Sequence, residues 1–139
     1  MTSTQRPTWA RLDCNFRRNP KVMELVSRRD GWQALVMYLD SIAYTTEHLC
    51  DGFVPKNWPR LNGYPAALPR MLLRADLWHE VSDLYPEEAQ DIQSGYIIHD
   101  FDKYQVTRSE WESVSERNSR NARKRWSKQR LRSVPSDPA

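Results

Sequence analysis

Apolar side chains recur at helical spacing most clearly between residues 32 and 49. No Gly or Pro interrupts this stretch, and its apolar positions follow the i, i+3, i+4, i+7 pattern of one helix face. These positions are Trp32, Leu35, Val36, Leu39, Ile42 and Ala43. The pattern predicts a central helix from Trp32 to Leu49 that turns this face toward the core.

The segments on either side of this helix carry start and stop signals of their own. Asn19 and Pro20 are typical of a helix N-terminus, because Asn caps free N–H groups and Pro suits the first turn. A short helix is therefore predicted from Lys21 to about Arg29. Beyond the central helix, residues 53–55 (FVP) predict a very short strand.

After the short strand, the chain carries the pattern of two helices joined by a tight turn. The first covers residues 56–61, and the pair Asn62-Gly63 forms the turn because both residues tolerate a positive φ. The second helix is predicted over residues 65–77. Since Pro69 lies within it, this helix either kinks there or begins near Leu68.

The last third of the chain predicts two strands and a long helix. The strands are expected over residues 78–83 and 95–101, with a polar, acidic loop between them. Thr107 and Glu110 then form a capping box, in which each side chain reaches the other's backbone N–H. The helix that they open begins with acidic residues and ends with basic ones, as the helix dipole favours.

This order of elements predicts an α+β, mainly helical fold: a winged helix-turn-helix with a C-terminal basic helix. In such a fold the second helix of the turn enters the major groove of DNA while the first crosses the backbone. The expected organisation is a flexible N-terminus (1–7), a winged-helix domain (8–105), the basic helix (106–132) and a disordered tail (133–139). The side chains expected in the core are Trp32, Leu35, Leu39, Ile42, Leu68, Leu72, Trp78 and Ile97.

Positive charge is concentrated near the end of the chain. The 139 residues include 21 Lys or Arg and 18 Asp or Glu, and eight of the bases but no acid lie between Arg117 and Arg132. That run is therefore +8 and the remainder −5, which suits a polyanion such as DNA; the alternative is a solvated tail that keeps the protein in solution. The contacts expected here are Arg117, Arg120, Arg123, Lys124, Arg125, Trp126, Lys128 and Arg130.

A second basic group lies in the predicted helix-turn-helix. Arg70 and Arg74 are one turn apart on the second helix, where Arg can read guanine through two hydrogen bonds. Lys56 and Arg60, on the first helix, are expected to contact phosphates. The alternative is that all four are ordinary solvent-facing side chains.

Five motifs resemble those of small actinobacteriophage proteins with a winged helix like the N-terminal domain of phage replication-initiation and replisome-organiser (DnaD-like) proteins. The motifs are WARLDCNFRRNPKV, DGFVP, AALPRMLLRADLW, GYIIHDFDKYQVTRSEWE and RNARKRW, and together they cover roughly residues 8–126. The resemblance implies a DNA-binding module in phage replication initiation or regulation. Two departures from the family favour an accessory protein or regulator. The wing loop is acidic, with Glu87, Glu88 and Asp91, and too few residues follow the basic helix for a helicase-loading domain.

The sequence leaves open whether the main partner is DNA or a protein. DNA, duplex or single-stranded, is the first expectation. Residues 76–102, however, hold eight acids and no Lys or Arg, so the alternative is a protein-binding regulator or inhibitor of a host or phage replication protein that uses this acidic surface. The sequence leaves the number of copies in the assembly undetermined.

Patterns typical of enzymes and metal sites are missing from the sequence. Cys14 and Cys50 are expected to be reduced, and no CxxC or HExxH spacing predicts a metal site. The four Gly form no phosphate-binding loop, so we expect a non-enzymatic protein without a cofactor. No apolar run reaches the roughly 18 residues of a membrane span, and the start lacks a signal-peptide core, which predicts a cytoplasmic protein in a bacterial host.

Overall fold

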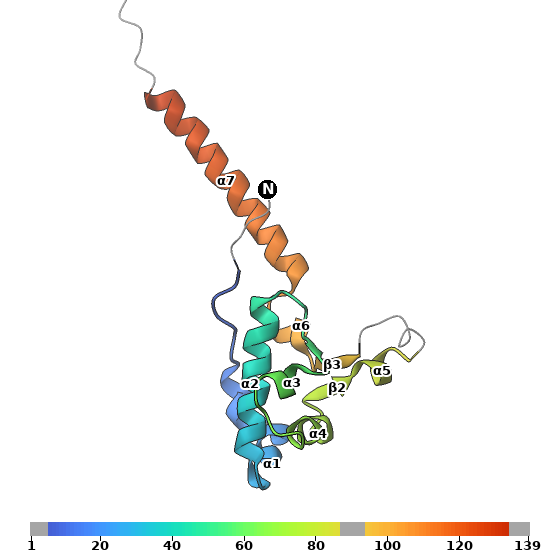
Figure 1. The fold of residues 1–139 in the computed structure, drawn as a ribbon. Coiled ribbons are helices and arrows are strands. Elements are labelled where there is room, and N and C mark those ends of the chain that lie inside the picture. The colour runs from blue at the N-terminus through green and yellow to red at the C-terminus, as the bar shows by residue number, and fades with distance from the viewer. Residues whose placement is uncertain (1–5, 87–93, 134–139) are drawn as a thin grey trace, which may run out of the picture. The chain divides into compact units, whose positions relative to one another are not determined.

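The structure is a computed structural model that describes the backbone of residues 6–86 and 94–133, with side chains as far as Lys128. The chain divides between Thr107 and Arg108 into two compact units. The unit from Gln5 to Thr107 is α+β and mainly helical with a small antiparallel sheet, which confirms the predicted class (Figure 1). The other unit contains the helix α7 (Arg108–Ser133).

The N-terminal helices begin where the sequence predicts. A 3₁₀ turn, η1 (Cys14–Arg18), precedes α1 (Pro20–Ser27), and the Asn19 side chain accepts a hydrogen bond of 2.9 Å from the Lys21 N–H. The central helix α2 (Gly31–Glu47) follows almost at once. Gly31 is required at this joint, since a Cβ there would lie 1.9 Å from the Leu25 carbonyl oxygen.

The segment predicted to hold a short strand and two helices joined by a turn contains shorter helices than expected. It comprises β1 (Phe53–Pro55), α3 (Trp58–Leu61) and α4 (Leu68–Arg74), with Gly63 at φ 79° in the turn. The alternative of a start near Leu68 is therefore confirmed, whereas the predicted end at residue 77 is wrong. The helix begins near Leu68 because Pro fits only its first turn, and it stops before Asp76, whose φ is 56°.

Within the described residues, three strands form one antiparallel sheet in the order β1-β3-β2, where β2 is Trp78–Glu80 and β3 is Gly95–Ile98. Both β2 and β3 are shorter than the predicted strands. A helical turn, α5 (Val81–Leu84), replaces the end of the first, and α6 (Phe101–Tyr104) replaces the end of the second. The acidic residues Glu87, Glu88 and Asp91 lie outside the described residues.

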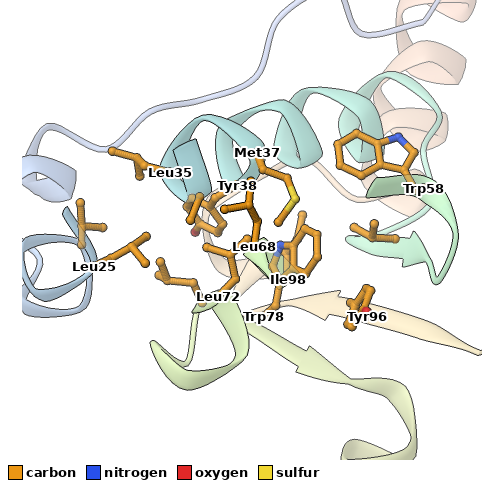
Figure 2. Close-up of a cluster of buried hydrophobic side chains, with 14 of the residues drawn as sticks. Leu25, Leu35, Met37, Tyr38, Trp58, Leu68, Leu72, Trp78, Tyr96 and Ile98 are labelled. Atoms are coloured by element: carbon orange, nitrogen blue, oxygen red, sulfur yellow. The ribbon is translucent and has the colours of Figure 1, made fainter. Parts of the chain in front are cut away.

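The core lies between α2, α4 and the sheet (Figure 2). The expectation is confirmed for Leu35, Leu68, Leu72 and Trp78, all of which are buried. The indole N–H of Trp78 donates to the Ser41 hydroxyl on α2 at 3.3 Å, and its ring stacks on Tyr96 with centroids 4.8 Å apart. This side chain therefore joins the sheet to the central helix.

The predicted core is wrong for two residues of α2. Trp32 is 67% exposed and Leu39 is 37% exposed, while Ile42 and Ile97 are only half-buried. The apolar residues of α2 lie on two faces, and the face that packs on α4 and the sheet runs through Ala34, Leu35, Met37, Tyr38, Ser41 and Thr45. In β3 the neighbours Tyr96 and Ile98 point inward instead of Ile97.

Candidate nucleic-acid interface

The turn between α3 and α4 is anchored to the central helix. The Tyr64 hydroxyl, just after the turn, donates to the Asp40 carboxylate on α2, and its ring lies 5.8 Å from that of Trp58 on α3. Burial, followed by this hydrogen bond, raises the pKa of Tyr64 to about 12. These contacts of Tyr64 fix the turn and α3 against the central helix α2. Binding sites need side chains that are held on rigid elements in this way.

The core positions of α4 determine which of its side chains face solvent. Leu68 and Leu72 are buried, so Arg70 and Arg74 project from the other face, where both are exposed. Arg60 is likewise exposed on α3. Three of the four cations predicted in this segment therefore lie accessible on the two helices joined by the turn.

The fourth cation, Lys56, is engaged by the sheet. Its Nζ lies 3.0 Å from Glu80 Oε1 and 4.7 Å from the centre of the Tyr96 ring. The hydrogen bond to Glu80 raises the pKa of Lys56, so the side chain stays charged. Because Glu80 neutralises much of that charge, we expect Lys56 to contribute least of the four to an anion surface.

Helix α1 adds cations that were not predicted as site residues. The Lys21 ammonium donates to the Asp76 carbonyl at 3.3 Å, which places it just beyond the C-terminal end of α4. Arg28, which pairs with Glu24 at 2.7 Å, lines a cavity of about 40 Å³ together with Arg74 of α4. Residues 6–29 hold seven Lys or Arg and two acids, which is a sequence signal for a basic surface. Spacing along the chain could not show that α1 lies beside α4.

Helix α7 presents basic side chains without packing them. Every side chain from Arg117 to Lys128 is exposed. Because the helix is continuous, four of its cations share one side, called here the basic face: Arg117, Arg120, Lys124 and Lys128, at i, i+3, i+7 and i+11. Arg123 and Arg125 lie outside this face. Trp126 lies on the side opposite the basic face. The side chain of Arg130 falls outside the described residues.

A pair of histidines lies at the edge of the sheet, with His79 on β2 and His99 directly after the end of β3. His79 Nε2 and His99 Nδ1 are 2.7 Å apart, so one ring donates to the other. Burial, and then the charge of Lys21, lower the pKa of His99. Among the described residues, no group of three or more His, Cys, Asp or Glu is placed to hold a metal ion, and both cysteines are free thiols.

Comparison with known proteins places no further constraint on these surfaces. No protein-family model matches the chain, and no curated protein or solved structure is detectably similar to it. The resemblance to phage replisome organisers therefore rests on the sequence motifs alone. Within the described part of the chain, no helix combines the length and apolar character needed to cross a membrane.

Proposed function

We propose that this protein is a non-enzymatic DNA-binding protein of the winged helix-turn-helix type. One observation carries the proposal: α4 follows a connection over residues 62–67 that is anchored to α2, and it projects Arg70 and Arg74 outward. The order of elements also supports it, since a strand precedes the two helices and joins the following strands in a sheet of order β1-β3-β2.

The cations would divide the work according to their geometry. Arg70 and Arg74 lie on the helix that enters the major groove, where Arg reads guanine O6 and N7. Arg60 on α3 and Lys21 on α1 flank that helix and would hold phosphates, which fixes the register without reading sequence. Since α4 has seven residues and is about 10 Å long, it can reach only a few base pairs.

The basic face of α7 would supply affinity without sequence preference. Its four cations have no acidic neighbour between Arg117 and Lys128, and all are open to solvent. Neutralising phosphates releases counterions, so such contacts make binding strongly dependent on salt. The role in phage replication, as an accessory protein or regulator of initiation, comes from the motif resemblance and forms part of the same proposal.

The first test is a salt titration of the full chain and of a variant that ends at Glu116. Fluorescence anisotropy with a random duplex measures the slope of log affinity against log salt, which is about −0.9 for each phosphate neutralised. If the basic face of α7 contacts a duplex, truncation should flatten this slope by about 3 to 4. An unchanged slope would mean that α7 does not contact the duplex.

The second test asks whether α4 reads sequence and needs no known target. A random duplex library is enriched by the wild type and by the Arg70→Ala, Arg74→Ala and Arg70→Lys variants. The wild type should enrich a short motif, and each Ala variant should lose preference at one position, at a cost of about 1–3 kcal/mol on the enriched site. Arg70→Lys should also lose it, because Lys keeps the charge but not the two-bond geometry.

Lys103→Ala serves as the matched control, because Lys103 is an exposed cation on α6, apart from α4 (Figure 1). It should keep the enriched motif and the affinity of the wild type. If the full chain binds neither duplex nor single-stranded DNA at low salt, the proposal fails. That outcome would favour the alternative in which the acidic residues 76–102 bind a basic protein.

A further inference from the structure

The solvent side of α2 carries a narrow apolar stripe. It consists of Trp32, Val36, Leu39 and Ala43, at i, i+4, i+7 and i+11, and all four are exposed. At about 100° per residue these positions fall within roughly 60° of the helix circumference. The exposed fractions of Trp32 and Val36 are 67% and 57%, which is unusual for large apolar side chains that share one line on a helix.

This spacing is that of a helix–helix seam. Alternating steps of four and three residues place side chains where they interlock with those of a second helix. Among its described side chains, helix α7 of the same chain has no matching stripe, because its apolar residues Trp111 and Val114 are separated from Ala122 and Trp126 by seven polar positions, 115–121. The occupant must therefore bring an apolar seam of similar length from elsewhere.

The stripe is complementary to itself when two copies run antiparallel. Trp32 of one copy then lies opposite Ala43 of the other, and Val36 lies opposite Leu39, so each layer pairs a larger side chain with a smaller one. The charges agree with the same arrangement. The exposed Arg28 and Arg29 precede α2, whereas Glu47 ends it, so antiparallel packing brings basic residues of one copy to an acidic residue of the other.

We propose that the stripe on α2 is a dimer interface, at which two copies of this chain pack antiparallel about a twofold axis. Such an interface is isologous, since the same residues face one another from both copies. Four side chains on each helix form a small contact. We therefore expect reversible association that depends on concentration rather than a permanent dimer. The inference is independent of the proposed DNA binding.

The first experiment is sedimentation velocity of the full chain between about 1 μM and about 1 mM, a span that covers weak to moderate association. The mean mass should rise from monomer toward dimer. Val36→Glu should abolish this rise, because it places a charge in the seam. Leu61→Glu is the matched control: Leu61 is 70% exposed on α3, outside the stripe, so the variant should dimerise like the wild type.

The second experiment tests the pairing of large with small residues. Trp32→Ala should leave a gap opposite Ala43, and Ala43→Trp should set two Trp side chains against each other, so neither variant should self-associate. An equimolar mixture of the two should form a heterodimer, because each Trp again meets an Ala. All these positions are exposed in the monomer, and circular dichroism should confirm that each variant folds.

Three results would overturn the inference. A wild type that stays monomeric over the whole range excludes a second copy and leaves the stripe to a partner of different sequence. If the Val36→Glu variant dimerises as strongly as the wild type, the dimer interface lies elsewhere on the protein. A mixture of Trp32→Ala and Ala43→Trp that stays monomeric would likewise reject the packing proposed for the seam.

Discussion

A matched pair of substitutions compares a leucine on the buried face of α4 with a leucine on the solvent-facing side of α2. Leu72 on α4 is fully buried against α2 and the sheet, whereas Leu39 on α2 is 37% exposed. The sequence pattern predicts both as core residues. Leu72→Ala and Leu39→Ala remove the same three carbon atoms, so the comparison isolates the environment of the side chain.

The expected costs follow from burial. Leu72→Ala leaves a cavity in packed surroundings and should lower the free energy of unfolding by about 3–5 kcal/mol, as for other fully buried leucines. Leu39 loses only the buried part of its contacts, and at about 0.8 kcal/mol per buried methylene this amounts to about 1.5 kcal/mol. Because the site is open to solvent, no cavity forms, and the better helix propensity of Ala returns a few tenths of a kcal/mol.

Urea unfolding followed by tryptophan fluorescence measures both variants against the wild type. The protein is kept near 1 μM, roughly the low end of the association range, so that self-association through the stripe on α2 does not contribute. The unfolding midpoints should differ while the urea dependence stays constant. If Leu39→Ala costs as much as Leu72→Ala, then Leu39 is a core residue and its face of α2 is not open to solvent.

Three further predictions concern separate parts of the chain. Trp126→Ala should leave duplex affinity unchanged, because Trp126 faces away from the basic face, but should weaken single-strand binding by about 1–3 kcal/mol through lost base stacking. Fluorescence anisotropy with duplex and single-stranded DNA measures both affinities, and an equal loss on the two DNAs would contradict the prediction. Burial and the charge of Lys21 hold the pKa of His99 below 6.5, so the unfolded chain takes up more protons, and the free energy of unfolding should fall as pH drops from about 7 to about 5. His99→Gln should flatten that part of the pH profile, and a slope unchanged in the variant would assign it to other groups. Thr46 carries a buried hydroxyl that has no hydrogen-bond partner among the described residues. Thr46→Val should therefore raise the free energy of unfolding by about 1 kcal/mol. A loss of stability in urea unfolding would indicate a partner for that hydroxyl.

Local signals in the sequence determined where several elements begin. Asn19 and Pro20 start α1, the Asn62-Gly63 pair forms the turn, and Pro69 sets the start of α4. These features depend on the residue's own φ range, N–H group or capping side chain, which act within a few residues of the chain. The basic character of α7 is equally local, since it needs only the order of its residues.

Only the tertiary structure decided which faces are used. The periodicity of α2 is satisfied by two apolar faces, and contact with α1, α4 and the sheet selects the one through Leu35 and Tyr38. The same contact leaves Trp32 outside, where it forms the proposed dimer seam. Likewise, Lys21 comes beside α4 and Glu80 engages Lys56 through contacts between segments far apart in the sequence. A helix pattern repeats every 3.6 residues whichever partner it meets, so it predicts a helix but not its neighbour.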